Sequence, residues 1–167
     1  MKKSSDPAMG AAMKIDEFDA KILNLLQDDN QITSQELARR VNLSPASCLR
    51  RVKRLRQEGV IVADVSIVAP EALGRRLTMV VLVTVEREQP QLLDEFRRSM
   101  MQIPEVTQCY YVTGDADFVL VVSVVDMEEY EAFTNRFLFE NRNVRRFQTM
   151  VVMNKVKFSC KQPVQPG

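Results

Sequence analysis

The chain has 167 residues, of which 46% are hydrophobic and 27% are charged, and its formal net charge at pH 7 is +1. This composition excludes a wholly disordered polyelectrolyte, and the length suits one ordinary domain or two small ones. No apolar run reaches the roughly 18 residues that a membrane span needs, so we expect a cytoplasmic protein without a secretion signal.

The sequence has few of the residues that usually act in catalysis or bind metals. It contains no histidine, and its three cysteines form no C-x-x-C pair. Histidine is the usual general base and the commonest metal ligand in proteins, and paired cysteines mark many zinc and redox sites. We therefore expect no catalytic residue, no metal site and no cofactor, and an enzyme is the less favoured class.

Periodicity begins after a polar start. Residues 1–13 show no sustained pattern and are predicted to form a disordered tail. Apolar residues then recur at helical spacing from Phe18 to Leu26, which predicts a first helix. A capping box at Thr33-Ser34-Gln35-Glu36 predicts a second helix, in which the Thr33 hydroxyl accepts the Glu36 amide and the Glu36 carboxylate reaches back.

A third helix is predicted from Ser44 to Gly59. Ser44 can cap its first turn, and Pro45 suits the first helical position because its missing N–H would have no partner there. Asn42 turns the chain before this helix, since asparagine tolerates a left-handed backbone. The β-branched segment "VIVADVSIV" follows and is expected to form a small β wing. Residues 14–63 are thus predicted to be a winged helix-turn-helix domain.

The third helix belongs to a strongly basic stretch. From Arg39 to Gln57 the sequence has seven basic residues and no acidic residue. A helical projection places Cys48, Val52 and Leu55 on the core side and most of the basic side chains on the other. Uncompensated charge on the second helix of a helix-turn-helix, beginning with small residues, is typical of a recognition helix in the DNA major groove. The alternative is a solvated charged surface without a partner.

The predicted DNA-binding residues lie at the start and on the outer side of this helix: Ser44, Pro45, Ala46, Ser47, Arg50, Arg51, Lys53 and Arg54. Residues early in a recognition helix meet base edges, so Ser47 and Arg50 are the expected base contacts. Arg51, Lys53 and Arg54 are expected to contact phosphates.

Residues 64–77 are predicted to be a linker strand and connector, and the pattern then alternates between strands and helices. Four β-rich runs and two amphipathic helices give the order βαββαβ over residues 78–158, a ferredoxin-like arrangement with both helices on one face of an antiparallel sheet. Several strands are apolar at nearly every position, so the other face is expected to be buried against a second subunit. Residues 159–167 are predicted to be a flexible C-terminal tail.

Taken in order, these motifs resemble the Lrp/AsnC, or feast/famine, family of transcription regulators. The resemblance runs from about Ile15 to Phe158 and rests on "IDEFDAKILNLLQ", "ITSQELARRVNLSPASCLRRVKRLRQEGVI", "PEALG" and "VTGDADFVLVV". It implies an α+β protein with an N-terminal winged helix-turn-helix and a C-terminal βαββαβ (RAM-type) effector and dimerisation domain. It also implies a nucleoid-associated bacterial or archaeal regulator whose partners are double-stranded DNA, further copies of itself up to a tetramer or octamer, and an amino-acid effector.

The same resemblance implies an effector site between subunits. Its residues here are those of the Gly-Asp-x-Asp loop, the following aromatic residue and a threonine of the last strand: Gly114, Asp115, Asp117, Phe118 and Thr149. Judged by itself, the loop offers free backbone amides and two carboxylates, which suit the two ends of an amino acid, but without the resemblance a plain Gly-Asp turn is the favoured interpretation. Phe147 departs from the family pattern, in which a small hydroxyl residue is common two places before Thr149.

Two other functions stay open at this point. One is an architectural DNA-coating protein that binds no ligand. The other is a ferredoxin-like enzyme, for which Asp115 and Asp117 are the one carboxylate pair worth testing.

Overall fold

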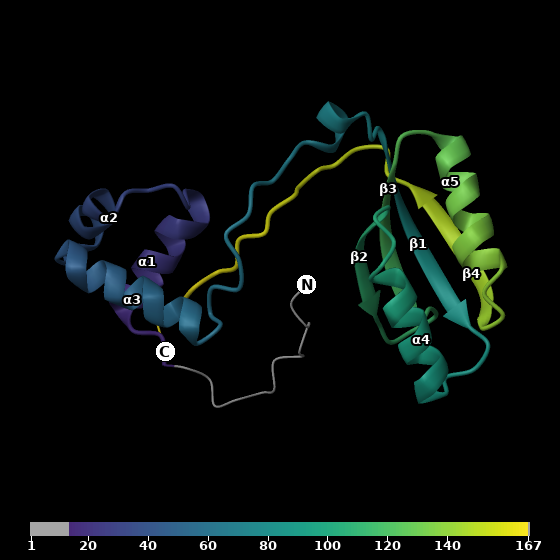
Figure 1. Cartoon of the computed structure of the whole chain (residues 1–167), viewed down its shortest axis with the longest axis horizontal. Helices are drawn as coiled ribbons and strands as arrows, with labels where there is room; N and C mark the ends of the chain where they lie inside the picture. The colour runs from purple at the N-terminus through teal and green to yellow at the C-terminus, as the bar shows by residue number, and fades with distance from the viewer. Residues whose placement is uncertain (1–13, 167) are drawn as a thin grey trace. The chain divides into compact units, whose positions relative to one another are not determined.

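The computed structural model describes residues 14–166, so the prediction for residues 1–13 lies outside the described part (Figure 1). The chain divides into two compact units. The first contains residues 14–66 together with residues 158–166, and the second contains Ile67–Lys157. Within residues 14–166, no helix has the length and apolar character that crossing a membrane requires.

Three helices form the first unit: α1 (Glu17–Asp28), α2 (Ser34–Val41) and α3 (Pro45–Gln57). Their apolar sides meet in one core made of Ile22, Leu23, Leu37, Ala38, Val41, Cys48, Val52 and Leu55. The predicted core side of the third helix is confirmed, because Cys48, Val52 and Leu55 are all buried. The opposite side of α3 therefore faces away from its own unit.

The turn between α2 and α3 has the local chemistry that the sequence predicts. Asn42 has φ 58° and ψ 47°, the left-handed conformation in which α2 ends. The Ser44 hydroxyl accepts the backbone N–H of Ser47 at 3.2 Å and so caps α3. α3 ends at Gln57, and Gly59, two residues later, has φ 73°, again in the left-handed region that favours glycine. Both ends of α3 are thus fixed by the residues that bracket it.

The capping box of α2 is only half formed. The Thr33 hydroxyl accepts the N–H of Glu36 at 3.2 Å, as predicted. The Glu36 carboxylate, however, accepts hydrogen bonds from Arg39 at 2.7 and 2.9 Å and from Arg40 at 2.7 Å. Charged donors three and four residues along the same helix compete with the cap amide for this carboxylate, and charge-assisted bonds are the stronger.

The segment that was predicted to form the β wing forms no strand in this structure. The structure assigns no helix or strand to residues 60–69, although their β-branched residues favour one. Most of the apolar side chains in this stretch are exposed: Val62, Val65, Ile67 and Val68. A strand requires the backbone N–H and C=O groups of a neighbouring strand, and within this single chain the segment is not paired with one.

The C-terminal segment also differs from the flexible tail that the sequence predicts. Gln162 donates its N–H to the Gln27 side chain at 2.6 Å, and the Gln27 amide donates to the Gln162 carbonyl at 3.1 Å. Lys161 forms an ion pair with Asp28, and Val164 packs against the core of the first unit. Val164 and two hydrogen bonds between the Gln27 side chain and the Gln162 backbone thus hold the segment at the end of α1.

The second unit has the predicted βαββαβ order. Its elements are η1 (Pro70–Leu73), β1 (Leu77–Val85), α4 (Pro90–Met100), β2 (Val106–Tyr111), β3 (Phe118–Val124), α5 (Met127–Thr134), the π-helical turn η2 (Asn135–Phe139) and β4 (Val144–Val151). The sheet order is β2-β3-β1-β4, and all neighbouring strands are antiparallel (Figure 1).

Helices cover one face of this sheet but not the other within the second unit. Met79, Val81 and Val83 of β1 are fully buried beneath α4 and α5, in one core with Phe96 and Phe133. The alternate residues of β1 and its neighbours point to the other face, which carries Val80, Leu82, Val119, Val121, Tyr110 and Met150. These side chains are exposed or half-buried. One face of the sheet is therefore apolar, and no helix of the second unit covers it.

Candidate nucleic-acid interface

The outer side of α3 is built from small residues followed by two cations. Ser44, Pro45 and Ala46 are exposed at the start of the helix. Arg50 and Lys53 are exposed one and two turns later, and neither forms an ion pair or hydrogen bond with residues 14–166. This side can approach an anionic surface closely, because its first turn has no large side chain and its cations have no internal partner.

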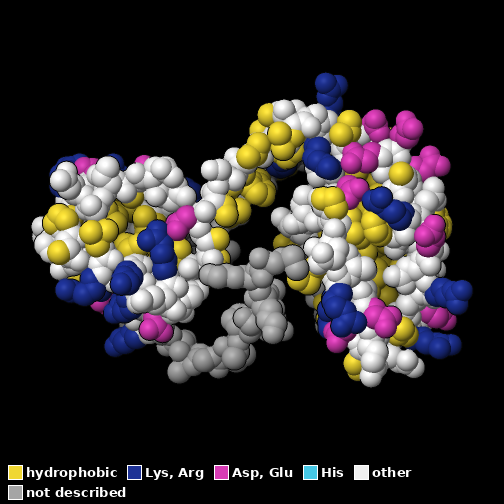
Figure 2. Space-filling model, viewed as in Figure 1, with side chains coloured by type: hydrophobic (Ala, Val, Ile, Leu, Met, Phe, Trp, Pro, Cys, Tyr) yellow, Lys and Arg dark blue, Asp and Glu magenta, His cyan; other side chains and the backbone are white. Residues whose placement is uncertain are grey.

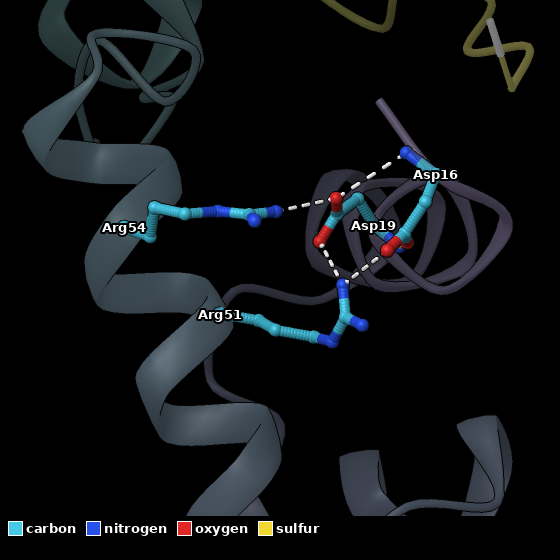
Figure 3. Close-up of polar contacts among 4 residues, drawn as sticks. All are labelled: Asp16, Asp19, Arg51 and Arg54. Carbon is cyan, nitrogen blue, oxygen red and sulfur yellow. Dashed lines mark hydrogen bonds and ion pairs between the residues drawn. The ribbon is translucent and has the colours of Figure 1, made fainter. Parts of the chain in front are cut away.

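Two of the predicted phosphate contacts have a different environment. Figure 3 shows Arg51 and Arg54 of α3 directed at the carboxylates of Asp16 and Asp19, at the start of α1. Arg51 Nη1 lies 2.7 Å from Asp16 Oδ2 and 2.8 Å from Asp19 Oδ1, and Arg54 Nη2 lies 2.5 Å from Asp19 Oδ2. Both guanidinium groups are thus used inside the first unit, and they join α3 to α1.

The two aspartates are themselves tied together. Each accepts the backbone N–H of the other, at 2.8 Å for Asp16 Oδ1 and 3.3 Å for Asp19 Oδ2, so they form the capping box of α1. Burial raises the pKa of Asp16, but hydrogen bonds from the Asp19 amide and from Arg51 outweigh it and leave that pKa below its ordinary value. The hydrogen bonds that Arg51 donates to Asp16 and Asp19 raise the pKa of Arg51.

The remaining basic residues of the stretch also have acidic partners. Arg39 and Arg40 share Glu36, and Arg56 lies 3.0 Å from Asp64. The interpretation of this stretch as wholly uncompensated charge is therefore wrong: the sequence between Arg39 and Gln57 lacks acids, but neighbouring elements supply them. Figure 2 shows acidic side chains among the basic ones on the first unit.

Asp16 and Asp19 are the site residues that sequence analysis missed. Their spacing, Asp-x-x-Asp immediately before an apolar helical pattern, is a capping signal that could have been recognised. Their pairing with residues more than thirty positions away has no signal in a single sequence, because it depends on how α1 and α3 cross.

In the second unit, the structure places the predicted effector loop beside β1. Gly114 has φ 123°, a conformation that favours glycine. Asp117 Oδ2 accepts the N–H of Val85 at 2.7 Å, so one carboxylate of the suggested catalytic pair is bound to backbone. Asp115 is exposed, and its carbonyl lies 3.5 Å from an Arg146 guanidinium nitrogen. Sequence analysis did not identify Arg146 as a neighbour of this loop.

Phe118 and Thr149 lie elsewhere than the loop's exposed edge. Phe118 is fully buried, with its ring 4.5 Å from that of Phe96. Thr149 lies opposite Val81 in the sheet, and its hydroxyl is hydrogen-bonded to that of Tyr130. Val81 and the Val85 that binds Asp117 are separated by about 13 Å of strand. Within one chain, the five predicted effector residues do not converge on one point.

Two of the hollows in the second unit are close to these residues in sequence, but neither is lined by the loop or by Thr149. One, of about 320 Å³, is lined by Leu138, Phe139 and residues 144–147, and includes Phe147. The other, of about 420 Å³, lies between α4 and residues 141–143. Phe147 packs edge-on against Phe139 at 5.1 Å, so this departure from the family pattern fills space beside η2.

Comparisons with known proteins agree with this two-part arrangement. The family model of a winged helix-turn-helix DNA-binding domain matches residues 15–62, and that of the Lrp/AsnC ligand binding domain matches residues 78–161. An uncharacterized HTH-type transcriptional regulator of Sinorhizobium fredii is 53% identical over 154 residues, which cover 92% of this chain and 91% of the relative. The leucine-responsive regulatory protein of Haemophilus influenzae is 38% identical over 143 residues, 86% of each chain.

Solved structures give the same result. A transcriptional regulator from Neisseria meningitidis, crystallised as a complex with L-Met, superposes with a TM-score of 0.84 at 31% identity, over 89% of this chain and 96% of that chain. The helix-turn-helix unit, the antiparallel βαββαβ unit and their order along the chain are all matched, and the protein belongs to the Lrp/AsnC family of transcription regulators.

Proposed function

We propose that this protein binds double-stranded DNA sequence-specifically through α3, as a homodimer or larger assembly, and that an amino acid or related metabolite modulates this binding. The observation that carries the proposal is the outer side of α3: an exposed, small-residue first turn followed by two cations, Arg50 and Lys53, that have no partner among residues 14–166. Such a regulator acts on chromosomal DNA, so we propose that it works in the cytoplasm at the nucleoid.

The geometry of α3 supports a division of labour. Pro45 and Ala46 allow the helix end to come close to base edges, and Arg50 lies one turn later on the same side. An arginine there can donate two hydrogen bonds to a guanine edge, whereas Lys53, a turn further on, is suited to a phosphate as a point charge. We assign Ser47 and Arg50 to bases and Lys53 to the backbone.

A second copy of the chain is the partner proposed for the open sheet face. Val80, Leu82, Val119 and Val121 lie side by side on this face, and an apolar patch of this kind is unfavourable in water. Pairing two such faces removes them from solvent and brings two copies of α3 into one assembly. Two recognition helices can then enter successive major grooves, roughly 34 Å apart, on a pseudo-palindromic site.

The Gly114–Asp117 loop is the proposed place for the effector. Its exposed Asp115 and the nearby Arg146 present charges of opposite sign, which suit the ammonium and carboxylate groups of an amino acid. The L-Met complex of the Neisseria meningitidis regulator supports an amino acid as the ligand class. Because Phe118 is buried and Thr149 lies away from the loop, we propose that a neighbouring subunit completes the site.

Binding-site selection tests the DNA proposal. Arg50→Ala should cost about 1–3 kcal/mol on the selected site and relax the preference at one base position, because it removes a base contact. Lys53→Ala should weaken all sequences alike and reduce the salt slope by about 1. Equal losses on every sequence for both variants would refute the base contact of Arg50.

The effector proposal needs its own measurement. Thermal shift with each amino acid should show stabilisation by at least one of them, and Asp115→Asn should abolish that shift while leaving DNA binding intact. A protein that binds DNA but shows no shift with any amino acid would have an architectural role instead.

A further inference from the structure

We propose that Asp19 determines how specifically α3 binds DNA, by holding Arg51 and Arg54 away from the phosphate backbone. This inference rests on the DNA binding proposed above. Asp19 is on α1, outside the predicted recognition helix. Its carboxylate forms ion pairs with two of the five basic side chains of α3, Arg51 and Arg54 (Figure 3). Arg56 is paired with Asp64, so the cations of α3 that remain available to DNA are Arg50 and Lys53.

The first step of the argument is burial. The Asp19 side chain is 1% exposed, although it carries a charge. A buried carboxylate is tolerated when it is paired and hydrogen-bonded, and Asp19 meets this condition through Arg51, Arg54 and the Asp16 amide. Releasing either arginine to a phosphate would leave this charge less compensated, so the pairing opposes their movement toward DNA.

The second step is the direction of the side chains. Successive residues of a helix turn by about 100°, so Arg50, Lys53 and Gln57 share the side opposite the core residues of α3. Arg51 lies on the flank toward α1, where its guanidinium also stacks 5.5 Å from the centre of the Phe18 ring. Arg51 is 24% exposed and Arg54 44% exposed, so Arg51 is the more firmly held of the two.

The third step is what the withdrawn charge does to binding. Each phosphate contact adds about 0.9 to the slope of log K against log salt, and these contacts strengthen all sequences equally. A helix with five free cations would bind any duplex tightly. Pairing Arg51 and Arg54 with Asp19 removes sequence-independent affinity. The base contacts at the start of α3 then supply a larger share of the binding free energy.

Two neighbouring cations on α3 provide the decisive comparison. On a random-sequence duplex, Lys53→Gln should lower the salt slope by about 0.9, because Lys53 is free to contact phosphate. Arg54→Gln should leave the slope at the wild-type value, because its guanidinium is held by Asp19. Both variants remove one positive charge from the same helix, so a general charge effect would change both slopes equally.

Asp19→Asn provides the converse test. Without the carboxylate charge, Arg54 should become available, whereas Arg51 keeps its ion pair with Asp16, so the salt slope should steepen by about 0.9 and the ratio of specific to non-specific affinity should fall. Asp29→Asn is the matched control: it removes one negative charge from the end of α1, and asparagine can keep the bond that Asp29 accepts from the Gln31 N–H at 2.9 Å. The control should change neither quantity.

The outcomes separate this inference from the proposed function. If the wild-type protein binds duplex DNA and Arg54→Gln lowers the slope as much as Lys53→Gln does, the role of Asp19 is overturned while DNA binding stands. If Asp19→Asn does not fold, by circular dichroism, the comparison of Lys53 with Arg54 decides alone. A wild-type protein without salt-dependent affinity for any duplex would overturn both proposals.

Discussion

Glu36 lies between two guanidinium groups on one face of α2. Hydrogen bonds from Arg39 and Arg40 lower its pKa from the ordinary value of 4.5 to about 2. A carboxylate whose pKa falls on folding stabilises the folded state above its unfolded pKa, and this contribution is lost as the pH falls through the folded value. The interaction of Glu36 with the two arginines therefore adds to the stability of the folded state above about pH 4.5. This contribution is lost as the pH falls from 4.5 to about 2.

This predicts a pH-dependent effect of Glu36→Gln. Near neutral pH the variant should be slightly less stable to urea than the wild-type protein, because the ion pairs are exposed and therefore weak. The difference should shrink as the pH is lowered from 4.5 toward 2. High salt should also reduce it, since salt screens exposed pairs. A difference that stays constant over this pH range would contradict the proposed origin.

At the residue scale, local chemistry could be predicted and long-range pairing could not. Asn42 and Ser44 have the conformation and the cap that their neighbours in sequence require. Arg51 and Arg54 have partners on another helix, and the helical projection that placed them outward cannot show which helix lies beside that flank. The same reason separates Thr149 from the loop at Gly114, since their distance depends on sheet register.

Elements with a strong period were the predictable ones. The three helices of the first unit follow from helical periodicity, and the four strands of the second follow from runs rich in apolar β-branched residues. Residues 60–69 carry the composition of a strand, but composition supplies no partner for its backbone groups. The C-terminal segment has too few apolar residues to show a period, so its place along α1 was not foreseen.

The contact of this segment with α1 predicts the effect of a charge at Val164. Val164→Asp should lower the stability of the first unit by about 1 kcal/mol, because it replaces a partly buried apolar side chain with a charged one. Amide hydrogen exchange across α1 should speed up, as measured by mass spectrometry. Gln165→Asp adds the same charge at an exposed neighbour and should change little. If the two variants behave alike, the segment does not dock on α1.

For the whole molecule, the order of the two units along the chain followed from the motifs, whereas the proposed assembly of several chains rests on the open face of the sheet. Val80 lies at the centre of the open sheet face, between Val121 and Met150. Val80→Lys should shift the assembly to single chains, because a lysine cannot be buried there without a partner. Multi-angle light scattering measures this directly. Met101→Lys, at the exposed end of α4, is the control, and equal masses for both variants would place the contact elsewhere.

The chain passes from the first unit to the second near Ser66 and returns near Phe158. The first unit is therefore built from two separate segments of the sequence. A fragment truncated after Ser66 would expose to solvent the apolar side chains that Val164 covers. A protease nick in residues 60–66 would yield two pieces that remain associated through Gln27 and Asp28. An isolated first unit should therefore be produced with residues 158–166 joined to it.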